Sequence, residues 1–272
     1  MQDKSEKENI MVKDTTVNVL IPMYKQEMTG LEKISFNNIY NTLNSHPITV
    51  IKPESLDLSA LKEEYPLIAF ESFDDTYFKG ITGYNRLLLS AVFYERFLNH
   101  TYILICQLDS YVFRDELLHF CSKDYDYIGA PWLKKKIYQN FIMTFLLDNK
   151  KKRYNKKDKP CRQNLYNKVG NGGFSLRKTQ SFCHAIERHA ERIAFYLSHE
   201  NVPLYNEDVF WAIEVPEFKY PPVQEAMQFA FDKYPAYCYE LNGNQLPFGC
   251  HGWYKRKWKG FWKEFINFDE KV

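Results

Sequence analysis

Two runs of almost continuous apolar residues constrain the fold most. Residues 16–24 (TVNVLIPMY) and 102–109 (YILICQLD) are rich in β-branched and aliphatic side chains. Strands that are apolar on both faces are typical of the interior of a parallel sheet. Helical spacing over residues 29–44 and a short apolar run at 48–51 complete a strand–helix–strand unit. We therefore predict an α/β protein with a mostly parallel central sheet flanked by helices.

The same patterns continue along the chain. Residues 67–70 read as a third strand, and two turn-forming glycines, Gly80 and Gly83, precede a predicted helix over residues 84–99. Residues 125–132 are strand-like, and a further helix is predicted over residues 179–197.

The length of 272 residues allows one full-sized core with appendages. Residues 1–15 are expected to form a disordered tail, because they are charged and lack periodicity. A single Rossmann-like domain is predicted for residues 16–255, with a basic insertion at 134–160. Residues 256–272 are expected to form a C-terminal tail of aromatic and basic residues.

Composition excludes several classes of protein. A formal net charge of +2 disfavours a nucleic-acid binder, because such proteins carry a strongly basic face. The six cysteines show no paired spacing, and the N-terminal residues have no apolar signal region, so a cytoplasmic protein is expected. Aromatic residues make up 17% of the chain, and such rings either stack on sugars and nucleobases or fill the core.

Residues 134–159 differ from the rest of the chain. They hold ten Lys or Arg residues against two acids, around the apolar segment 141–147 (FIMTFLL). One interpretation is a mobile, solvated insertion that folds over the site. The other is a peripheral contact with anionic lipid at the inner membrane face.

Four segments carry residues suited to chemistry. Asp109 ends an apolar strand, where a carboxylate can hold a divalent cation or simply cap a turn. Residues 170–173 (GNGG) permit a close approach of the backbone to a ligand, although glycine clusters also mark simple turns. Glu207 and Asp208 open an amphipathic stretch and are suited either to general-base catalysis or to the helix dipole. His251 lies between small residues and could join a distant Asp at a metal or diphosphate site.

Taken in order, five segments resemble the bacterial DUF5672 family of proposed glycosyltransferases over residues 16–255. They are QLDSYVF (107–113), DYIGAPW (126–132), VGNGGFSLR (169–177), EDVF (207–210) and PFGCHGW (247–253). The resemblance implies a GT-A fold that binds a nucleotide sugar, with a UDP-sugar favoured. It also implies a glycan acceptor, such as a cell-surface polysaccharide, or a lipid-linked one.

The resemblance further implies roles for individual residues. Asp208, or its neighbour Glu207, would be the base of an inverting transfer. Asp109 and His251 would hold manganese or magnesium, although Gln107 replaces the first acid of the usual Asp-x-Asp motif, which leaves a metal requirement open. The residues expected to contact the donor are Gly83, Asn85, Arg86, Gln107, Asp109, Gly172 and Gly173, and residues 19–24 are expected beside the base.

Three alternatives stay open at this stage. Lys79, Arg86 or the basic insertion could supply positive charge in place of a metal. The same site could serve a nucleotide-sugar hydrolase or a nucleotidyltransferase. The incomplete Asp-x-Asp motif is also compatible with a catalytically inactive nucleotide- or glycan-binding protein.

Overall fold

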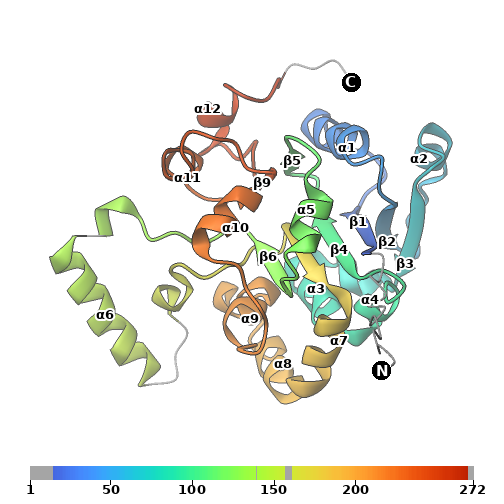
Figure 1. The fold of residues 1–272 in the computed structure, drawn as a ribbon. Coiled ribbons are helices and arrows are strands. Elements are labelled where there is room, and N and C mark those ends of the chain that lie inside the picture. Colours follow the sequence, from blue (N-terminus) through green and yellow to red (C-terminus); the bar gives the residue numbers. More distant parts are fainter. Residues whose placement is uncertain (1–14, 139, 157–160, 269–272) are drawn as a thin grey trace, which may run out of the picture.

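A six-stranded sheet forms the centre of the computed structural model, which describes residues 15–138, 140–156 and 161–268 (Figure 1). Its strand order is β3-β2-β1-β4-β7-β6. The strands are β1 Val17–Pro22, β2 Ile48–Pro53, β3 Ala69–Phe73, β4 Tyr102–Cys106, β6 Tyr127–Gly129 and β7 Phe174–Lys178. Neighbouring strands from β3 to β4 are parallel, and β7 is antiparallel to both β4 and β6. The predicted mostly parallel sheet is confirmed.

A second, three-stranded sheet lies beyond the end of β4. It has the order β5-β9-β8, with β5 Ser110–Val112, β9 Gly249–His251 and β8 Ala230–Phe231. β5 pairs antiparallel and β8 parallel with β9. This small sheet joins β5 to β8 and β9, which lie more than a hundred residues later in the sequence.

Helices cover both faces of the large sheet (Figure 1). The α-helices are α1 Gly30–Thr42, α2 Ser59–Glu64, α3 Gly80–Leu88, α4 Ala91–Glu95, α5 Leu117–Ser122, α6 Phe141–Asn155, α7 Thr179–Arg188, α8 Ala190–Leu197, α9 Glu207–Ile213, α10 Val223–Phe229, α11 Pro235–Leu241 and α12 Lys259–Trp262. Four 3-10 turns are η1 Asp75–Phe78, η2 Lys136–Tyr138, η3 Arg162–Leu165 and η4 Pro203–Tyr205.

The core has three parts. Residues of α1, α2, α5 and α10 pack on one face of the sheet, and residues of α3, α4, α7, α8 and α9 pack on the other. The third cluster lies around the small sheet and contains the buried Trp253 and Trp262. Much of the aromatic content therefore fills the core, because rings such as Phe182, Trp211 and Phe229 are fully buried.

Two predicted helices are each divided in the structure. The helix expected over residues 84–99 becomes α3 and α4, because Ser90 adopts an extended backbone between them. The helix expected over residues 179–197 becomes α7 and α8, which meet at His189. In both cases the apolar pattern continues across the break. The reason is that the two short helices bury their apolar faces in the same core cluster.

The two appendages differ in how they are held. α6, in the basic insertion, projects from the body of the molecule (Figure 1). The C-terminal segment instead packs against the small sheet through Trp262 and Ile266. The predicted tail residues 1–14, like insertion residues 157–160, lie outside the described residues. Within the described part of the chain, no helix is both long and apolar enough to cross a bilayer.

Candidate functional site

A cavity of about 540 Å³ opens at the edge of the sheet where the parallel strands end. Tyr24 follows β1 and Gln107 follows β4, and both side chains line it. The start of β7 reaches the same edge because this strand runs antiparallel to β4, so Gly172 and Gly173 also line the cavity. Ligands of open α/β sheets bind at this edge.

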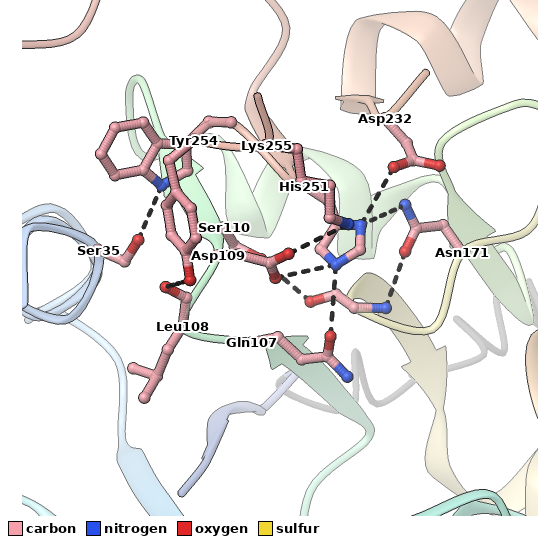
Figure 2. Close-up of polar contacts among 12 residues, drawn as sticks. Ser35, Gln107, Leu108, Asp109, Ser110, Asn171, Asp232, His251, Tyr254 and Lys255 are labelled. Carbon is pink, nitrogen blue, oxygen red and sulfur yellow. Dashed lines mark hydrogen bonds and ion pairs between the residues drawn. The ribbon is translucent and has the colours of Figure 1, made fainter. Parts of the chain in front are cut away.

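The small sheet brings three polar residues together beside the cavity. β5 begins directly after Asp109, β9 ends at His251, and β8 ends directly before Asp232. As Figure 2 shows, the His251 ring lies between the two carboxylates. Its Nε2 is 2.9 Å from Oδ1 of Asp109, and its Nδ1 is 3.2 Å from Oδ1 of Asp232.

Two further side chains complete this cluster. Oε1 of Gln107 lies 3.3 Å from Nε2 of His251. Nζ of Lys255 lies 3.2 Å from Oδ2 of Asp109, and Lys255 reaches the cavity wall from an otherwise exposed position. The cluster therefore combines two carboxylates with two side chains that can carry positive charge, His251 and Lys255.

Interactions between opposite charges control the protonation of the residues in this cluster. Burial alone would lower the pKa of His251, but the charge and hydrogen bond of Asp109, together with Asp232, raise it to about 9. Burial raises the pKa of Asp109, yet His251 and Lys255 outweigh it and hold that pKa well below its usual range. The carboxylates of Asp109 and Asp232 thus favour the protonated, cationic form of His251.

The glycine segment is shaped by its neighbours. A Cβ on Gly173 would lie 2.2 Å from Nε2 of His251, and a Cβ on Gly172 would lie 2.0 Å from Oε1 of Glu207. Such distances are far inside van der Waals contact. Asn171 holds the turn with a φ of 86° and accepts a hydrogen bond from the Gly173 N–H at 2.8 Å. Because Gly172 and Gly173 have no side chain, the carboxylate of Glu207 and the ring of His251 can approach the backbone.

The paired acids stand at the start of α9 but in different environments. Glu207 is buried, and both of its carboxylate oxygens lie 3.2 Å from the guanidinium of Arg177, which is itself fully buried. Asp208 is only partly buried and lines the cavity, and its carboxylate accepts the N–H of Val209. Asp208 is therefore the more available of the two carboxylates.

Burial changes the acidity of both groups. It raises the pKa of Glu207 to about 7, against the lowering effect of Arg177 and with a further increase from Asp208. Burial also raises the pKa of Asp208 above its ordinary value. A carboxylate with a raised pKa is a better proton acceptor, which is the property that a general base needs.

Aromatic rings also line the cavity. Tyr24 packs edge-on against Tyr84, with ring centroids 5.9 Å apart, and lies 5.8 Å from Phe78. The Tyr24 ring is about half exposed, so one part of it remains available to a flat ligand.

Comparison with known proteins agrees with this architecture. The model of the family described as "Protein of unknown function (DUF5672)" matches residues 67–251. The chain belongs to the DUF5672 family. No curated protein matches its sequence.

Solved structures resemble this member of DUF5672 in fold. Galactosyltransferase LgtC, in complex with donor and acceptor sugar analogues, superposes with a TM-score of 0.52 at 14% identity over 86% of each chain. An active-site mutant of LgtC gives 0.51 at 15% identity, also over 86% of each chain. The glycosyltransferase GlyE of Streptococcus pneumoniae gives 0.51 at 11% identity, covering 94% of this chain and 62% of that one. These similarities confirm the predicted GT-A fold.

The structure brings most of the predicted site residues of this DUF5672 chain to the cavity. Asn85, Gln107, Gly172, Gly173, Glu207, Asp208 and His251 line it, and Asp109 does not line it but contacts His251. Asn85 also ties α3 to α9, because its amide donates to Asn206 and accepts the N–H of Glu207.

Two predicted donor-binding residues lie elsewhere. Gly83 packs α3 against η1, where an added Cβ would meet the carbonyl oxygen of Thr76 at 2.5 Å. Arg86 forms an ion pair with Glu200 and does not line the cavity. Lys79 is exposed between Phe78 and Gly80, both of which line the cavity.

Sequence reasoning missed several residues of the site. Asp232 and Lys255 join the His251 cluster, while Phe78, Tyr84 and Asn206 line the cavity. Lys255 could have been found, because it follows His251 by four residues in a loop of the predicted site. Asp232 carries no such signal, since only the pairing of β8 with β9 brings it close to His251.

The residues present fit a divalent cation. Asp109 Oδ1 and Gln107 Oε1 lie 2.9 Å and 3.3 Å from His251 Nε2, and such oxygen and nitrogen ligands suit manganese or magnesium. Asp232 on the other ring nitrogen is a carboxylate partner of the kind that orients metal-binding histidines. Within the described residues, no cluster offers three or more Asp, Glu, His or Cys ligands to one ion, so solvent or phosphate oxygens would complete the coordination.

Proposed function

We propose that this protein is a glycosyltransferase that moves a sugar from a nucleotide-sugar donor to a hydroxyl of a glycan or lipid-linked acceptor. One observation carries the proposal. The available carboxylate of Asp208 and the cationic His251 cluster line the same cavity, at the ligand-binding edge of a GT-A fold. A base and a phosphate-binding group on one cavity are the two elements that such a transfer requires.

The base acts on the acceptor. An acceptor hydroxyl has a pKa far above neutrality, so Asp208 would take its proton as the oxygen attacks the anomeric carbon. Glu207 is a positioning residue in this scheme, because its ion pair with Arg177 fixes the first turn of α9. A single displacement of this kind inverts the anomeric centre.

Positive charge stabilises the departing nucleoside diphosphate. Lys255 lines the cavity with its ammonium group beside Asp109, so it can reach a phosphate oxygen by exchanging this partner. A divalent cation bound to Asp109, His251 and Gln107 would add charge neutralisation at the two phosphates. Uracil, the base of the favoured UDP-sugar donor, would stack on the exposed part of Tyr24.

Calorimetric titration with nucleotides and nucleotide sugars, with manganese or with chelator, tests the donor site. We expect a nucleoside diphosphate sugar to bind and Asp109→Asn to weaken binding only where manganese is present. Asp115→Asn is the matched control, because Asp115 pairs with His46 away from the cavity.

Product analysis then tests the reaction. Sugar transfer to an acceptor with inverted anomeric configuration supports the proposal. Release of free sugar in equal amounts with and without acceptor would make the protein a hydrolase. Tight binding of the donor without turnover on any acceptor would make it a binding protein.

A further inference from the structure

The exposed face of α6 is apolar at one end and basic at the other. Helical spacing places Phe141, Ile142, Phe145 and Leu146 on one side of the first turns. The same side continues through Lys152, Arg153 and Lys156. The opposite side, with Met143, Leu147 and Tyr154, is partly buried and faces the protein, where the main contacts of α6 are with η2 and η3.

Exposed apolar side chains are concentrated at the first end of α6. Of the thirteen large apolar side chains that are exposed in the described residues, five lie between Ile137 and Leu146. Phe141 is 86% exposed and Phe145 is 60% exposed. Single exposed apolar residues are ordinary, whereas a contiguous group marks an interaction surface.

The basic end is not neutralised by the protein itself. Lys152, Arg153 and Lys156 form no ion pair with any residue that the structure describes. Elsewhere on the surface, basic residues commonly have acidic partners, as Arg86 has in Glu200 and Lys178 has in Asp124. The charge on α6 is therefore available to an anionic partner.

We propose that α6 docks this protein onto the anionic surface of a lipid bilayer. The exposed aromatic and aliphatic side chains at one end of α6 can enter the acyl boundary, while the unpaired Lys and Arg at the other end of the same side meet anionic headgroups. A second copy of the chain fits less well. If two α6 faces packed in parallel, their basic ends would lie together and repel each other. If they packed antiparallel, each basic end would lie on an apolar end and lose its hydration.

This inference does not rest on the proposed enzymatic function. Docking by α6 also leaves the large sheet and its cavity in place, because α6 projects from the body of the molecule (Figure 1). Membrane binding and donor binding can therefore be measured separately on the same variants.

Vesicle co-sedimentation of the full chain tests the proposal. We expect binding to phosphatidylcholine vesicles that contain phosphatidylserine, weaker binding to phosphatidylcholine alone, and a decrease as salt is added. The variant Lys152→Gln/Arg153→Gln/Lys156→Gln should lower the partition coefficient about a hundredfold, at about fivefold per charge. Phe141→Ser/Phe145→Ser should lower it at least about tenfold, because two large apolar side chains no longer enter the bilayer.

Matched variants on other exposed positions are the controls. Lys33→Gln/Lys62→Gln/Lys263→Gln removes the same charge, and Leu67→Ser/Leu118→Ser removes exposed apolar side chains. Both should bind vesicles as the unmodified chain does, and all four variants should keep its melting temperature and its nucleotide affinity. The proposal is overturned if the unmodified chain does not bind anionic vesicles, or if the control variants lose as much binding as the α6 variants. A concentration-dependent dimer that Phe141→Ser/Phe145→Ser abolishes, without vesicle binding, would assign this face to a second copy instead.

Discussion

At the scale of single residues, the two neighbouring acids of α9 have separable roles. We predict that Asp208→Asn lowers kcat by about a hundred- to ten-thousandfold, because the acceptor hydroxyl loses its proton acceptor. Donor affinity should stay the same, since Asp208 acts on the acceptor. Steady-state kinetics with donor titration measures both. An equal loss in kcat for Glu264→Gln, an exposed acid in the C-terminal segment, would contradict a specific role for Asp208.

The acidity of Asp208 gives this prediction a pH dependence. The base must be deprotonated, so kcat should rise with pH as Asp208 loses its proton. Burial raises the pKa of Asp208, which moves this acidic limb above the pH at which a free aspartate titrates. A pH profile of kcat measures the limb. A profile that is unchanged in a residually active Asp208→Glu variant would assign the limb to another group.

A further prediction at this scale concerns Gly173. In Gly173→Ala the new methyl would lie 2.2 Å from His251 Nε2 and 2.8 Å from Gln107 Oε1, so both side chains must move. We expect a loss of about 1–3 kcal/mol in the free energy of unfolding, as for other overpacked sites, together with weaker manganese-dependent donor binding. Gly260→Ala is the control, because nothing lies within 4 Å of its Cβ position. Chemical denaturation and calorimetry check the two effects.

Individual residues also show how far sequence could predict the site. Asp109, His251 and the acids at 207 and 208 were predictable, because they follow strands or open a helix in an ordered set of motifs. Asp232 was not, since an isolated acid between Phe231 and Lys233 has no local pattern. The position of Arg86 was not predictable either, because its partner Glu200 comes from a different part of the chain.

At the scale of elements, a buried ion pair joins β7 to α9. Arg177 donates to Glu207, to the Tyr94 hydroxyl and to Ser175. We predict that Arg177→Met lowers the free energy of unfolding by about 3–5 kcal/mol, because it leaves Glu207 buried without its counter-charge. In the double variant Arg177→Met/Glu207→Gln most of this loss should be recovered. Denaturant unfolding of the four proteins of the cycle measures the coupling, and additive losses would contradict it.

The same pair predicts how this loss varies with pH. The pKa of Glu207 in the folded chain is about 7, above the unfolded value of 4.5, so its contribution to stability is lost as pH rises through this interval. Removing Arg177 raises that pKa further, because the lowering effect of its charge disappears. The stability deficit of Arg177→Met should therefore be larger in mildly alkaline than in mildly acidic buffer. A deficit that shrinks as pH rises would argue against a charged Glu207.

Elements differ in how well sequence predicts them. β1, β2 and β4 were recognised because β-branched and aliphatic runs bury both faces of each strand. The breaks at Ser90 and His189 were not recognised, since neither residue interrupts the apolar pattern. β8 has two residues and β5 and β9 have three each, so these strands are defined by their pairing and by no local periodicity.

At the scale of the whole molecule, the C-terminal segment supports the site from outside the predicted domain boundary. Trp262 is fully buried and stacks on Phe113, which follows β5, with ring centroids 5.6 Å apart. The cluster around it also contains Phe231, Cys250 and Trp253, from or next to the strands that carry Asp232 and His251. The small sheet thus depends on residues beyond position 255 for one of its packing surfaces.

This arrangement predicts that the core of the C-terminal segment cannot be removed without loss of the site. Trp262→Ala should lower the free energy of unfolding by about 3–5 kcal/mol, as expected for a buried aromatic residue, and should weaken donor binding because the small sheet loses its support. Phe141→Ala removes an aromatic ring of α6 that is almost fully exposed and should change neither quantity. Denaturant unfolding and nucleotide titration of both variants provide the comparison. If Trp262→Ala unfolded at the same denaturant concentration as Phe141→Ala, the segment beyond residue 255 would be a dispensable tail, and the small sheet would owe its position to the large sheet alone.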